Sequence, residues 1–276
     1  MPELPEVETV ARGLHRYVTG GTVARATCRR ADIMRRGSLR LRRLEGGTVA
    51  GVERIGKNIA VRFDSRLTLV VNLGMTGRLL YSETGRFPRE YAGRHLHMLL
   101  HFTAGGEMRY HDPRRFGSLL VTDREEIASL LGLGKDPFQM SPREFHALLR
   151  GRRAPVKSIL LNQKLISGMG NIYIDEALFR AGIDPAAPAN AAAGRSGELL
   201  QAARAILRRA IRAGGTTVRD FRNAEGANGY FQRELVVYGR AGEPCIRCGS
   251  PLVRTVVAGR GTHFCPSCQP PAARDG

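Results

Sequence analysis

Four cysteines near the C-terminus constrain the fold of this 276-residue chain more than any other feature. They form two C-x2-C pairs separated by 16 residues: Cys245, Cys248, Cys265 and Cys268. Each pair can supply two thiolates from a tight turn, and a hairpin between the pairs can bring the turns together, as tetrahedral Zn²⁺ requires. We therefore expect one structural zinc site with four protein ligands, disulfides being the weaker alternative in a reducing cytoplasm. The fifth cysteine, Cys28, lies in an alternating apolar run over residues 23–28 and is expected to be buried.

The apolar pattern changes along the chain from strand-like to helical. Val7, Val10, Leu14 and Tyr17 recur at helical spacing, which predicts a first helix over residues 5–17. Short β-like runs separated by glycine turns follow, and such a succession favours a sandwich or barrel. The expected strands are residues 22–28, 48–55, 59–63, 67–73, 98–102, 107–110 and 118–121. The expected helices that follow are residues 124–131, 142–150, 154–161, 172–181 and 198–213.

The charge balance is strongly basic. The chain has 43 lysines and arginines against 25 acidic residues, a net charge of +18. This excess favours a polyanionic partner, and nucleic acid is the foremost class; a genome rich in arginine codons is the alternative explanation. No apolar run reaches the ~18 residues that a membrane helix needs, and the acidic N-terminus is unlike a signal peptide. We expect a soluble, cytoplasmic protein.

The first residues, MPELPEVE, contain a candidate nucleophile. Removal of Met1, usual before a small residue, would leave the Pro2 nitrogen as a secondary amine. An α-amino group titrates near ~8 and lysine near ~10, so this amine would keep an appreciable neutral fraction at cellular pH. Glu3 follows directly, which places a proton donor beside an amine that can form an iminium with a sugar aldehyde. The alternative is that Pro2 and Pro5 only fix an extended start to the first helix.

A glycine turn in the helical half is a candidate phosphate site. Gly168 and Gly170 allow the backbone to approach a ligand closely, and Asn171 is then expected to start a helix as its N-cap. Free N–H groups at a helix start, preceded by a glycine turn, bind phosphate well. The alternative is that Asn171 is a cap and nothing more.

Two further turns would expose large side chains. Arg114 and Phe116 lie on a turn after His111-Asp-Pro, and an arginine with an aromatic on a loop tip can wedge into a base stack. Met75 lies between glycines, where a turn would expose it, and Lys57 lies on a turn between two expected strands. The alternatives are core or turn packing for the first three residues and a solvated surface position for Lys57.

Taken together, these motifs resemble the formamidopyrimidine-DNA glycosylase family over essentially the full chain. The matching stretches are MPELPEVET, GK at 56–57, NLGMTG at 72–77, YHDPRRFG at 110–117, NQKLISGMGNIYIDEALF at 162–179, GTTVRDF and GYFQRELVVYGRAGEPC within 215–245, and GRGTHFCPSCQ at 259–269. The resemblance implies an α+β fold. An N-terminal two-sheet β-sandwich with flanking helices would precede a helical domain with a helix–two-turn–helix motif and a zinc finger, with DNA in the cleft between the domains.

The implied domain boundaries follow the change of pattern. Residues 1–125 would form the catalytic β-sandwich, 126–140 a linker, 141–235 the helical DNA-binding domain and 236–270 the zinc finger. Residues 216–230 would form a mobile, lesion-facing loop, and 270–276 a frayed tail. Arg78 could face the lesion pocket, although its sequence context does not place it. One DNA site per chain suggests a monomer.

The resemblance also assigns the chemistry. It implies that Pro2 is the nucleophile, that Glu3 protonates the sugar or the departing base, and that Glu6 is a supporting carboxylate. Lys57 would contact phosphate and assist the first elimination, and Arg260 would grip phosphate and assist the second. The substrate implied is double-stranded DNA with an oxidised purine, such as 8-oxoguanine or a formamidopyrimidine, or with an abasic site. The implied enzyme is both a glycosylase and a lyase that cleaves by β,δ-elimination.

The remaining implied contacts are to DNA. Three side chains would fill the hole left by the flipped nucleotide: Met75, Arg114 and Phe116. Further DNA contacts would come from His95, Arg114, Arg152 and Asn171, and the Arg152-Arg153 pair leaves a one-residue ambiguity in the match. The four C-terminal cysteines would hold the single zinc.

Three other functions compete with this one. A sister enzyme of the same fold, which removes oxidised pyrimidines, shares Pro2, Glu3 and the zinc finger, but the Met75, Arg114 and Phe116 set resembles the purine enzyme. A non-catalytic lesion-binding protein would not need the residues that the lyase chemistry uses. A zinc-ribbon RNA-binding protein would leave the PELPEVE terminus unexplained. We therefore expect a cytoplasmic, nucleoid-associated base excision repair enzyme.

Overall fold

The computed structural model describes residues 2–91, 93–216 and 229–271. The chain divides into two compact units, Met1–Leu130 with Ile211–Gln232 and Leu131–Ala210 with Arg233–Gly276, which are described separately. Most of the predicted loop at 216–230 and of the predicted tail at 270–276 lies outside the described residues.

The first unit begins with helix α1, Leu4–Val18. Glu3 is its N-cap in an extended conformation, and a proline occupies the first turn, where its missing N–H has no helical partner to lose. Val7, Val10 and Leu14 are at most 1% exposed, whereas Tyr17, in the last turn, is 42% exposed. The helical periodicity predicted for residues 5–17 is therefore confirmed.

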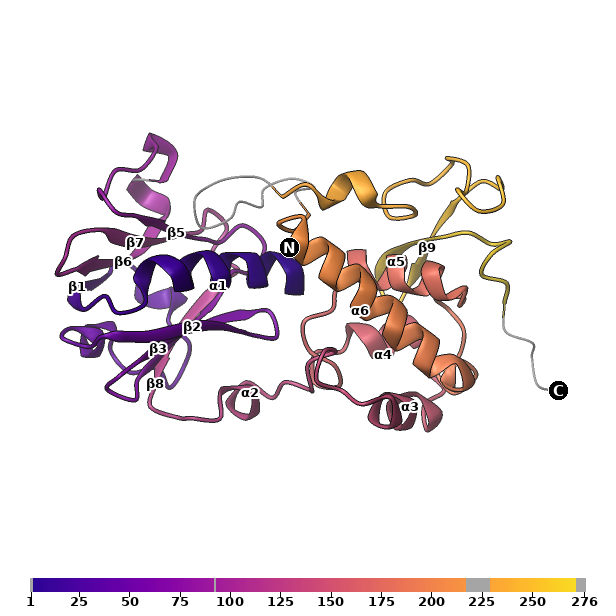
Figure 1. Ribbon diagram of the computed structural model, residues 1–276, viewed down its shortest axis with the longest axis horizontal. Coiled ribbons are helices and arrows are strands. Elements are labelled where there is room, and N and C mark those ends of the chain that lie inside the picture. The colour runs from indigo at the N-terminus through magenta and orange to yellow at the C-terminus, as the bar shows by residue number, and fades with distance from the viewer. Residues whose placement is uncertain (1, 92, 217–228, 272–276) are drawn as a thin grey trace. The chain divides into compact units, whose positions relative to one another are not determined.

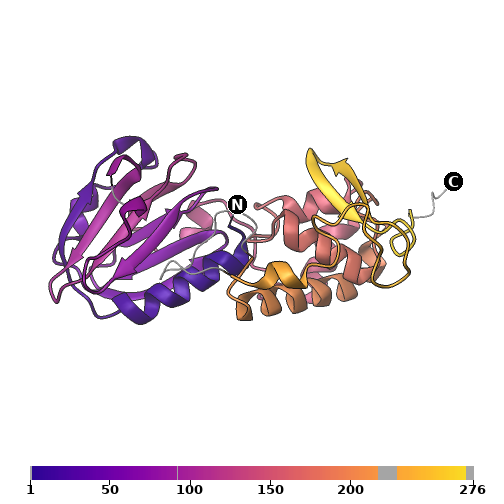
Figure 2. The same cartoon turned by 90° about the horizontal axis from the view of Figure 1, so that it is seen from above.

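The strands of the first unit form two four-stranded antiparallel sheets, ordered β1-β6-β7-β5 and β2-β3-β4-β8. The strands are β1 (Val23–Cys28), β2 (Val49–Ile55), β3 (Asn58–Phe63), β4 (Thr68–Asn72), β5 (Arg78–Ser82), β6 (Leu96–Phe102), β7 (Glu107–His111) and β8 (Ser118–Thr122). Figures 1 and 2 show them as two layers, with α1 packed along β2, β3 and β5. This is the predicted β-sandwich with a flanking helix.

The interior of the sandwich is apolar. Fully buried side chains at alternate strand positions fill it: Ile59 and Val61, Leu69 and Val71, Met108 and Tyr110, Leu119 and Val121. Burial of each such aliphatic side chain contributes about 1.5–3 kcal/mol. The period of two along the strands therefore accounts for the packing of the two layers.

Two details of the first unit differ from the predictions. Strand β5 was not predicted, because its two adjacent leucines are too short a run to show alternation. Cys28 is exposed, contrary to the prediction. The register of edge strand β1 shifts at a bulge between Val23 and Arg25, so the buried positions are Val23 and Ala26. Cys28 lies on the same face as Ala26, but it is the last residue of the strand, where its side chain is exposed.

A helical group makes up much of the second unit, and a short helix precedes it. Helix α2, Ile127–Leu130, belongs to the first unit and is shorter than the predicted 124–131. The longer helices are α3 (Pro142–Arg150), α4 (Val156–Leu161), α5 (Asn171–Ala181) and α6 (Ser196–Arg212). Ser141 caps α3 in a reciprocal capping box with Glu144. Gly182 ends α5 at φ 63°, a left-handed conformation that favours glycine.

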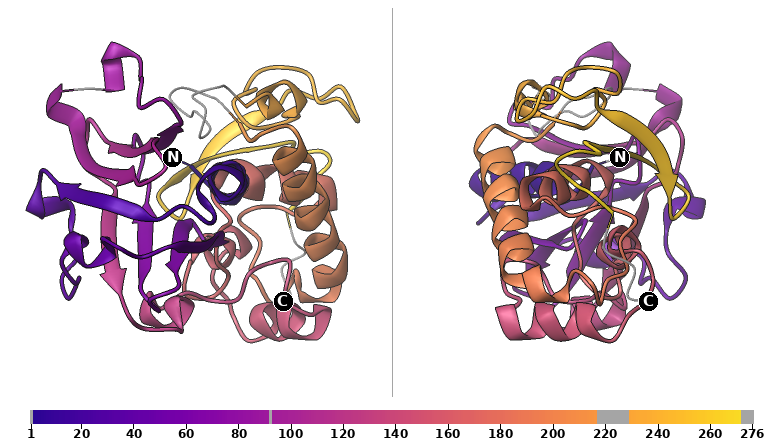
Figure 3. Two further views of the ribbon diagram at one scale, coloured as in Figure 1. Left: turned by 60° about the vertical axis from the view of Figure 1, so that its left-hand side comes forward. Right: turned by 90° about the vertical axis from the view of Figure 1, so that its right-hand side faces the viewer.

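The cysteine-containing segment forms an antiparallel hairpin of β9 (Val253–Val257) and β10 (Arg260–Phe264). This hairpin lies beside α5 (Figure 3). Phe179 of α5, Val237 and Leu252 are buried with Cys245 and Cys265 in one cluster. The zinc finger predicted from the cysteine spacing is therefore anchored to the helical group by a small apolar core.

Among the residues that the structure describes, no helix is long and apolar enough to cross a membrane.

Candidate functional site

The N-terminal residues of the first unit are held by one carboxylate. Glu6 Oε2 accepts a hydrogen bond from the Glu3 backbone N–H at 2.7 Å. Glu6 Oε1 accepts one from the Thr216 backbone N–H, also at 2.7 Å. Glu3 and Glu6 are both at most 3% exposed, and Pro2 is buried. Glu6 thus ties the start of the chain to the segment that begins the predicted lesion-facing loop.

The Pro2 nitrogen becomes an amine only after a processing step. Met1 precedes Pro2 in the sequence, and its peptide bond makes that nitrogen a tertiary amide. The extended conformation of Glu3 places the Pro2–Glu3 peptide outside the hydrogen-bonded turns of α1. Removal of Met1 would therefore create a secondary amine without disturbing the helix.

Lys57 lies on the turn between β2 and β3, as predicted. Gly56 adopts φ 60° there. The Asn58 side chain donates to the Ile55 carbonyl at 3.1 Å, and Asn72 Nδ2 donates to Asn58 Oδ1 at 3.0 Å. These amides fix the backbone that carries Lys57. No role was predicted for either asparagine, since asparagine in a turn has many roles.

The three predicted wedge residues lie on two loops of the first unit. Met75 is 40% exposed and Phe116 is 56% exposed, so both occupy exposed loop positions as predicted. The Arg114 guanidinium lies over the Phe116 ring at 4.5 Å from its centroid. Gly74 has φ 56°, and a Cβ there would lie 2.4 Å from the Phe116 carbonyl carbon. The two loops therefore meet through the backbone at a position that only glycine permits.

A buried aspartate holds these loops together. Asp112 is 0% exposed and accepts through Oδ1 from Thr76 Oγ1 at 2.6 Å and from the Arg114 N–H at 3.3 Å. Through Oδ2 it accepts from the Gly117 N–H at 2.9 Å and the Tyr110 hydroxyl at 3.2 Å. Burial and then the nearby Asp112 charge raise the pKa of Tyr110, which keeps the phenol a neutral donor. Asp112 precedes a proline in a turn, and nothing in that local pattern marks it as a functional residue.

His95 and Arg78 lie beside a buried histidine. The His95 ring packs edge-on against His111 at 5.7 Å, and Arg78 donates to the Tyr91 hydroxyl at 2.9 Å. Burial, followed by electrostatic interactions with His95 and Arg78, lowers the pKa of His111 to about 4. His111 is therefore neutral near pH 7. The structure places Arg78 on β5 with Tyr91 and Glu90, a position that the sequence could not supply.

The predicted phosphate contacts of the second unit lie on α5 and β10. Helix α5 begins at Asn171 with Gly170 as N-cap, so Asn171 is the first helical residue and not the cap. Its Nδ2 donates to the Gly261 carbonyl at 2.8 Å. Arg260 begins β10 and is exposed. The hydrogen bond to Gly261 therefore joins Asn171 to the residue that follows Arg260.

Arg152 is half-buried at the end of α3. Its Nη1 donates to the Leu148 carbonyl at 2.6 Å, which satisfies one of the last carbonyl groups of that helix. The predicted contact of Arg152 with DNA remains a prediction.

The four cysteine sulfurs converge as a zinc site requires. All four Sγ atoms lie within 4.8 Å of one another, with Cys245 to Cys268 at 3.9 Å and Cys248 to Cys265 at 3.5 Å. A tetrahedral ion with Zn–S bonds of ~2.3 Å places its sulfurs ~3.8 Å apart, so this arrangement fits Zn²⁺. The Arg247 N–H donates to Cys245 Sγ and the Cys268 N–H donates to Cys265 Sγ, both at 3.4 Å.

The thiols of the cluster differ in pKa because their surroundings differ. Burial, then hydrogen bonds with neighbouring thiols, raise the pKa of Cys268 to about 12. Hydrogen bonds from Ser250 lower the pKa of Cys248 to about 6. Four adjacent thiolates repel one another, and a bound dication removes that penalty. The residues fit one structural zinc.

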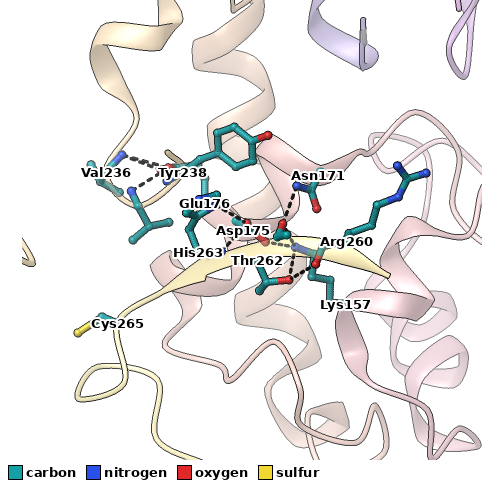
Figure 4. Close-up of polar contacts among 12 residues, drawn as sticks. Lys157, Asn171, Asp175, Glu176, Val236, Tyr238, Arg260, Thr262, His263 and Cys265 are labelled. Carbon is teal, nitrogen blue, oxygen red and sulfur yellow. Dashed lines mark hydrogen bonds and ion pairs between the residues drawn. The ribbon is translucent and has the colours of Figure 1, made fainter. Parts of the chain in front are cut away.

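A buried polar network that was not predicted from the sequence holds the β9–β10 hairpin and the segment that precedes it (Figure 4). Lys157 and Asp175 form an ion pair in which both side chains are 0% exposed. Glu176 accepts from the backbone N–H groups of three successive residues, at 2.9–3.1 Å: Val236, Val237 and Tyr238. A sequence signal existed, because two adjacent acids interrupt the apolar face of the predicted helix 172–181.

Comparison with known protein families accounts for most of the chain. Residues 1–119 match the model "Formamidopyrimidine-DNA glycosylase N-terminal domain". Residues 133–222 match "Formamidopyrimidine-DNA glycosylase H2TH domain", and residues 242–271 match "Zinc finger found in FPG and IleRS".

Individual relatives are similar over the full length. A formamidopyrimidine-DNA glycosylase of Ruegeria sp. strain TM1040 is 43% identical over 282 residues, with 98% of this chain and 100% of the relative covered. A Lactococcus lactis FPG mutant, solved with DNA containing Fapy-dG, gives a TM-score of 0.88 at 34% identity, covering 98% of this chain and 100% of that one. A MutM protein solved with DNA containing carbocyclic 8-oxo-G gives 0.87 at 34% identity, with the same coverage.

Proposed function

The chain belongs to the formamidopyrimidine-DNA glycosylase family, and on that premise we propose that it excises oxidised purines from duplex DNA and then cleaves the strand at the abasic site. The observation that carries the proposal is the N-terminus, where Glu6 binds the Glu3 backbone one residue after Pro2. Full-length similarity to relatives solved with Fapy-dG and 8-oxo-G DNA supports the substrate class.

The first steps require the Pro2 amine and a proton donor. The neutral amine attacks C1′ of the extruded deoxyribose, the bond from C1′ to the base breaks, and the base departs with a proton. The C1′–O4′ bond then opens, O4′ takes a proton from Glu3, and the nitrogen lone pair forms an iminium. Because the amine is secondary, this Schiff base is a cation, which is a strong electron sink.

The iminium drives strand cleavage. It acidifies the C2′ proton, whose loss expels the 3′ phosphate, and a second elimination expels the 5′ phosphate. We assign Lys57 to the first elimination and Arg260 to the second, each as a phosphate contact. Asn171 would contact a phosphate beside the lesion, from the start of α5. The product is a one-nucleoside gap with a phosphate on each side.

Extrusion of the nucleotide costs a few kcal/mol of stacking and pairing. The exposed Met75 and Phe116 side chains, with Arg114 over the Phe116 ring, would fill the vacated space and offset part of that cost. The net charge of +18 favours binding to the phosphate backbone whatever the DNA sequence. His95 and Arg152 are further candidate contacts to DNA.

Zinc would be held by the four cysteines and would stabilise the β9–β10 hairpin; it takes no part in the reaction steps. We propose domain boundaries at residues 1–125, 126–140, 141–235 and 236–270, with one chain acting as a monomer. We also propose that the enzyme acts in the cytoplasm, at the nucleoid, because its substrate is duplex DNA.

A borohydride trapping experiment tests the proposal. Sodium borohydride reduces the iminium and leaves the protein covalently joined to an 8-oxoguanine duplex, whereas Pro2→Gly, which offers only a primary amine, should trap at a much lower rate. A folded, DNA-binding protein that neither trapped nor cleaved would be a lesion-binding protein. The sister pyrimidine-specific enzyme is distinguished by a preference for thymine glycol over 8-oxoguanine opposite cytosine.

A further inference from the structure

A buried ion pair in the second unit holds the strand that carries Arg260. Lys157 Nζ on α4 lies 2.5 Å from Asp175 Oδ1 on α5, and both side chains are 0% exposed. We propose that this pair sets the position of Arg260 relative to Asn171, and so determines how efficiently the second elimination follows the first. The inference rests on the proposed function for the roles of Arg260 and Asn171.

The ion pair binds the residues directly after Arg260. Lys157 Nζ donates to Thr262 Oγ1 at 2.8 Å and to the Gly261 carbonyl at 3.3 Å. Asp175 Oδ2 accepts from the His263 backbone N–H at 2.9 Å. Thr262 Oγ1 in turn donates to the Arg260 carbonyl at 2.9 Å. Every residue of the first half of β10 is thus bonded to the pair or to a partner of the pair (Figure 4).

Asn171 is part of the same arrangement. Its Nδ2 donates to the Gly261 carbonyl at 2.8 Å, the carbonyl that also accepts from Lys157. Asn171 and Asp175 are four residues apart on α5, so they share one face of the helix. One face of α5 therefore carries Asn171, a candidate phosphate ligand, and also holds the strand that carries Arg260. This arrangement keeps the position of Arg260 relative to Asn171 constant.

Stability alone does not explain the choice of a buried ion pair here. Removing two charges from water is costly, and well-packed apolar residues of similar volume often stabilise a protein as much or more. An apolar pair, however, could not bond directionally to Gly261, Thr262 and His263. Those contacts are what the charged groups add.

The base of the zinc finger has a separate attachment. Glu176 binds the backbone N–H groups of Val236, Val237 and Tyr238, and the Phe179 cluster packs on Cys245 and Cys265. Loss of the Lys157–Asp175 pair should therefore leave the finger attached and zinc bound, while the first half of β10 moves. This separation makes the inference testable.

The test uses Lys157→Met/Asp175→Leu, which removes both charges and leaves neither buried alone. Single-turnover cleavage of an abasic-site duplex is resolved on a gel into the products of the first and second eliminations. We expect the ratio of the second-elimination rate to the rate of borohydride trapping to fall by about tenfold to a hundredfold. A small displacement of a positioned group has an effect of this order. Zinc content should stay at one per chain.

Two controls separate positioning from general destabilisation. Leu207→Ala removes a fully buried side chain of α6 in the same unit and should lower the melting temperature without changing the product ratio. Thr262→Val removes only the hydroxyl that accepts from Lys157, and should give a severalfold change in the same direction with the fold intact. If the double variant fails to fold or loses zinc, the product ratio of Thr262→Val tests the role of the ion pair in its place.

A double-mutant cycle shows whether the pair acts through Arg260. If it does, the double substitution should have little further effect on the second elimination in an Arg260→Gln background. A folded, zinc-loaded variant with the wild-type product ratio, or fully additive losses in the cycle, would overturn the inference. Wild-type protein that does not trap on lesion DNA would instead overturn the proposed function.

Discussion

Asp112→Asn is the substitution whose effect on the wedge loops follows most directly from the geometry. Two backbone N–H groups donate to the Asp112 carboxylate, each to a different oxygen: Arg114 N–H to Oδ1 and Gly117 N–H to Oδ2. An asparagine has one oxygen and one NH₂ group, so in either orientation one backbone N–H faces another donor. Neither backbone group can rotate away. Thr76 and Tyr110 hydroxyls can, and Tyr110 has the Asn72 carbonyl at 3.3 Å as a second acceptor.

The expected loss in the free energy of unfolding follows from the number of hydrogen bonds that are lost. One hydrogen bond to a charged group is lost, worth about 1.5–3 kcal/mol, and a buried N–H is left without a partner. Allowing for rotation of the hydroxyl donors, we expect unfolding free energy to fall by about 2–4 kcal/mol. In a unit of this size that corresponds to a drop in melting temperature of about 5–15 °C. Excision from an 8-oxoguanine duplex should fall at least tenfold, because Met75 and Phe116 lose their common anchor.

The assay pairs calorimetry with single-turnover base excision. Glu107→Gln serves as the matched control, because Glu107 is a buried acid on β7 that binds Arg109 and His101 rather than the wedge loops. That control should leave excision unchanged at temperatures where it is folded. An Asp112→Asn protein that melted within about 1 °C of wild type and excised at the wild-type rate would show that Asp112 does not hold the wedge loops in place.

Three further predictions concern the acid, the buried histidine and the metal. Glu3→Gln should lose base excision more severely than cleavage of a preformed abasic site, and equal losses would refute the acid role. The pKa of His111 is lowered to about 4 in the folded protein, so the unfolded chain binds a proton at this residue more readily than the folded chain does. The free energy of unfolding should therefore fall as the pH drops from about 6.5 towards 4. In thermal melts, His111→Gln should flatten this pH dependence, whereas His101→Gln should not. A zinc chelator should release one metal and reduce DNA binding measured by anisotropy, and unchanged binding after release would contradict a structural role.

The parts of the fold that the sequence predicts are those with strong periodicity or fixed ligand spacing. Val7, Val10 and Leu14 define α1 because only a helix places them on one face. The C-x2-C pairs define the finger because four sulfurs must surround one ion. Both signals are local, so no tertiary information is needed to interpret them.

The interactions that sequence could not supply join residues far apart in the chain. The Glu6 contact with Thr216 and the Asp112 contact with Thr76 depend on loop conformations that local pattern does not encode. Cys28 was mispredicted because it shares a face with the buried Ala26 but ends the strand, and alternation alone does not show where the covered part of a strand stops. The pairing of Lys157 with Asp175 required knowing that α4 and α5 pack together. Candidate site residues can thus be identified by motif, whereas what positions them has to come from structure.

Peptide mapping of the borohydride-reduced adduct identifies the nucleophile itself. Fully active protein is trapped on an 8-oxoguanine duplex and digested, and the modified peptide is located by mass spectrometry, with the N-terminus of the unreacted protein determined in parallel. We expect a chain that starts at Pro2 and carries the DNA fragment on the Pro2 nitrogen. An adduct on Lys57 or another lysine, or full activity in protein that retains Met1, would rule out Pro2 as the nucleophile.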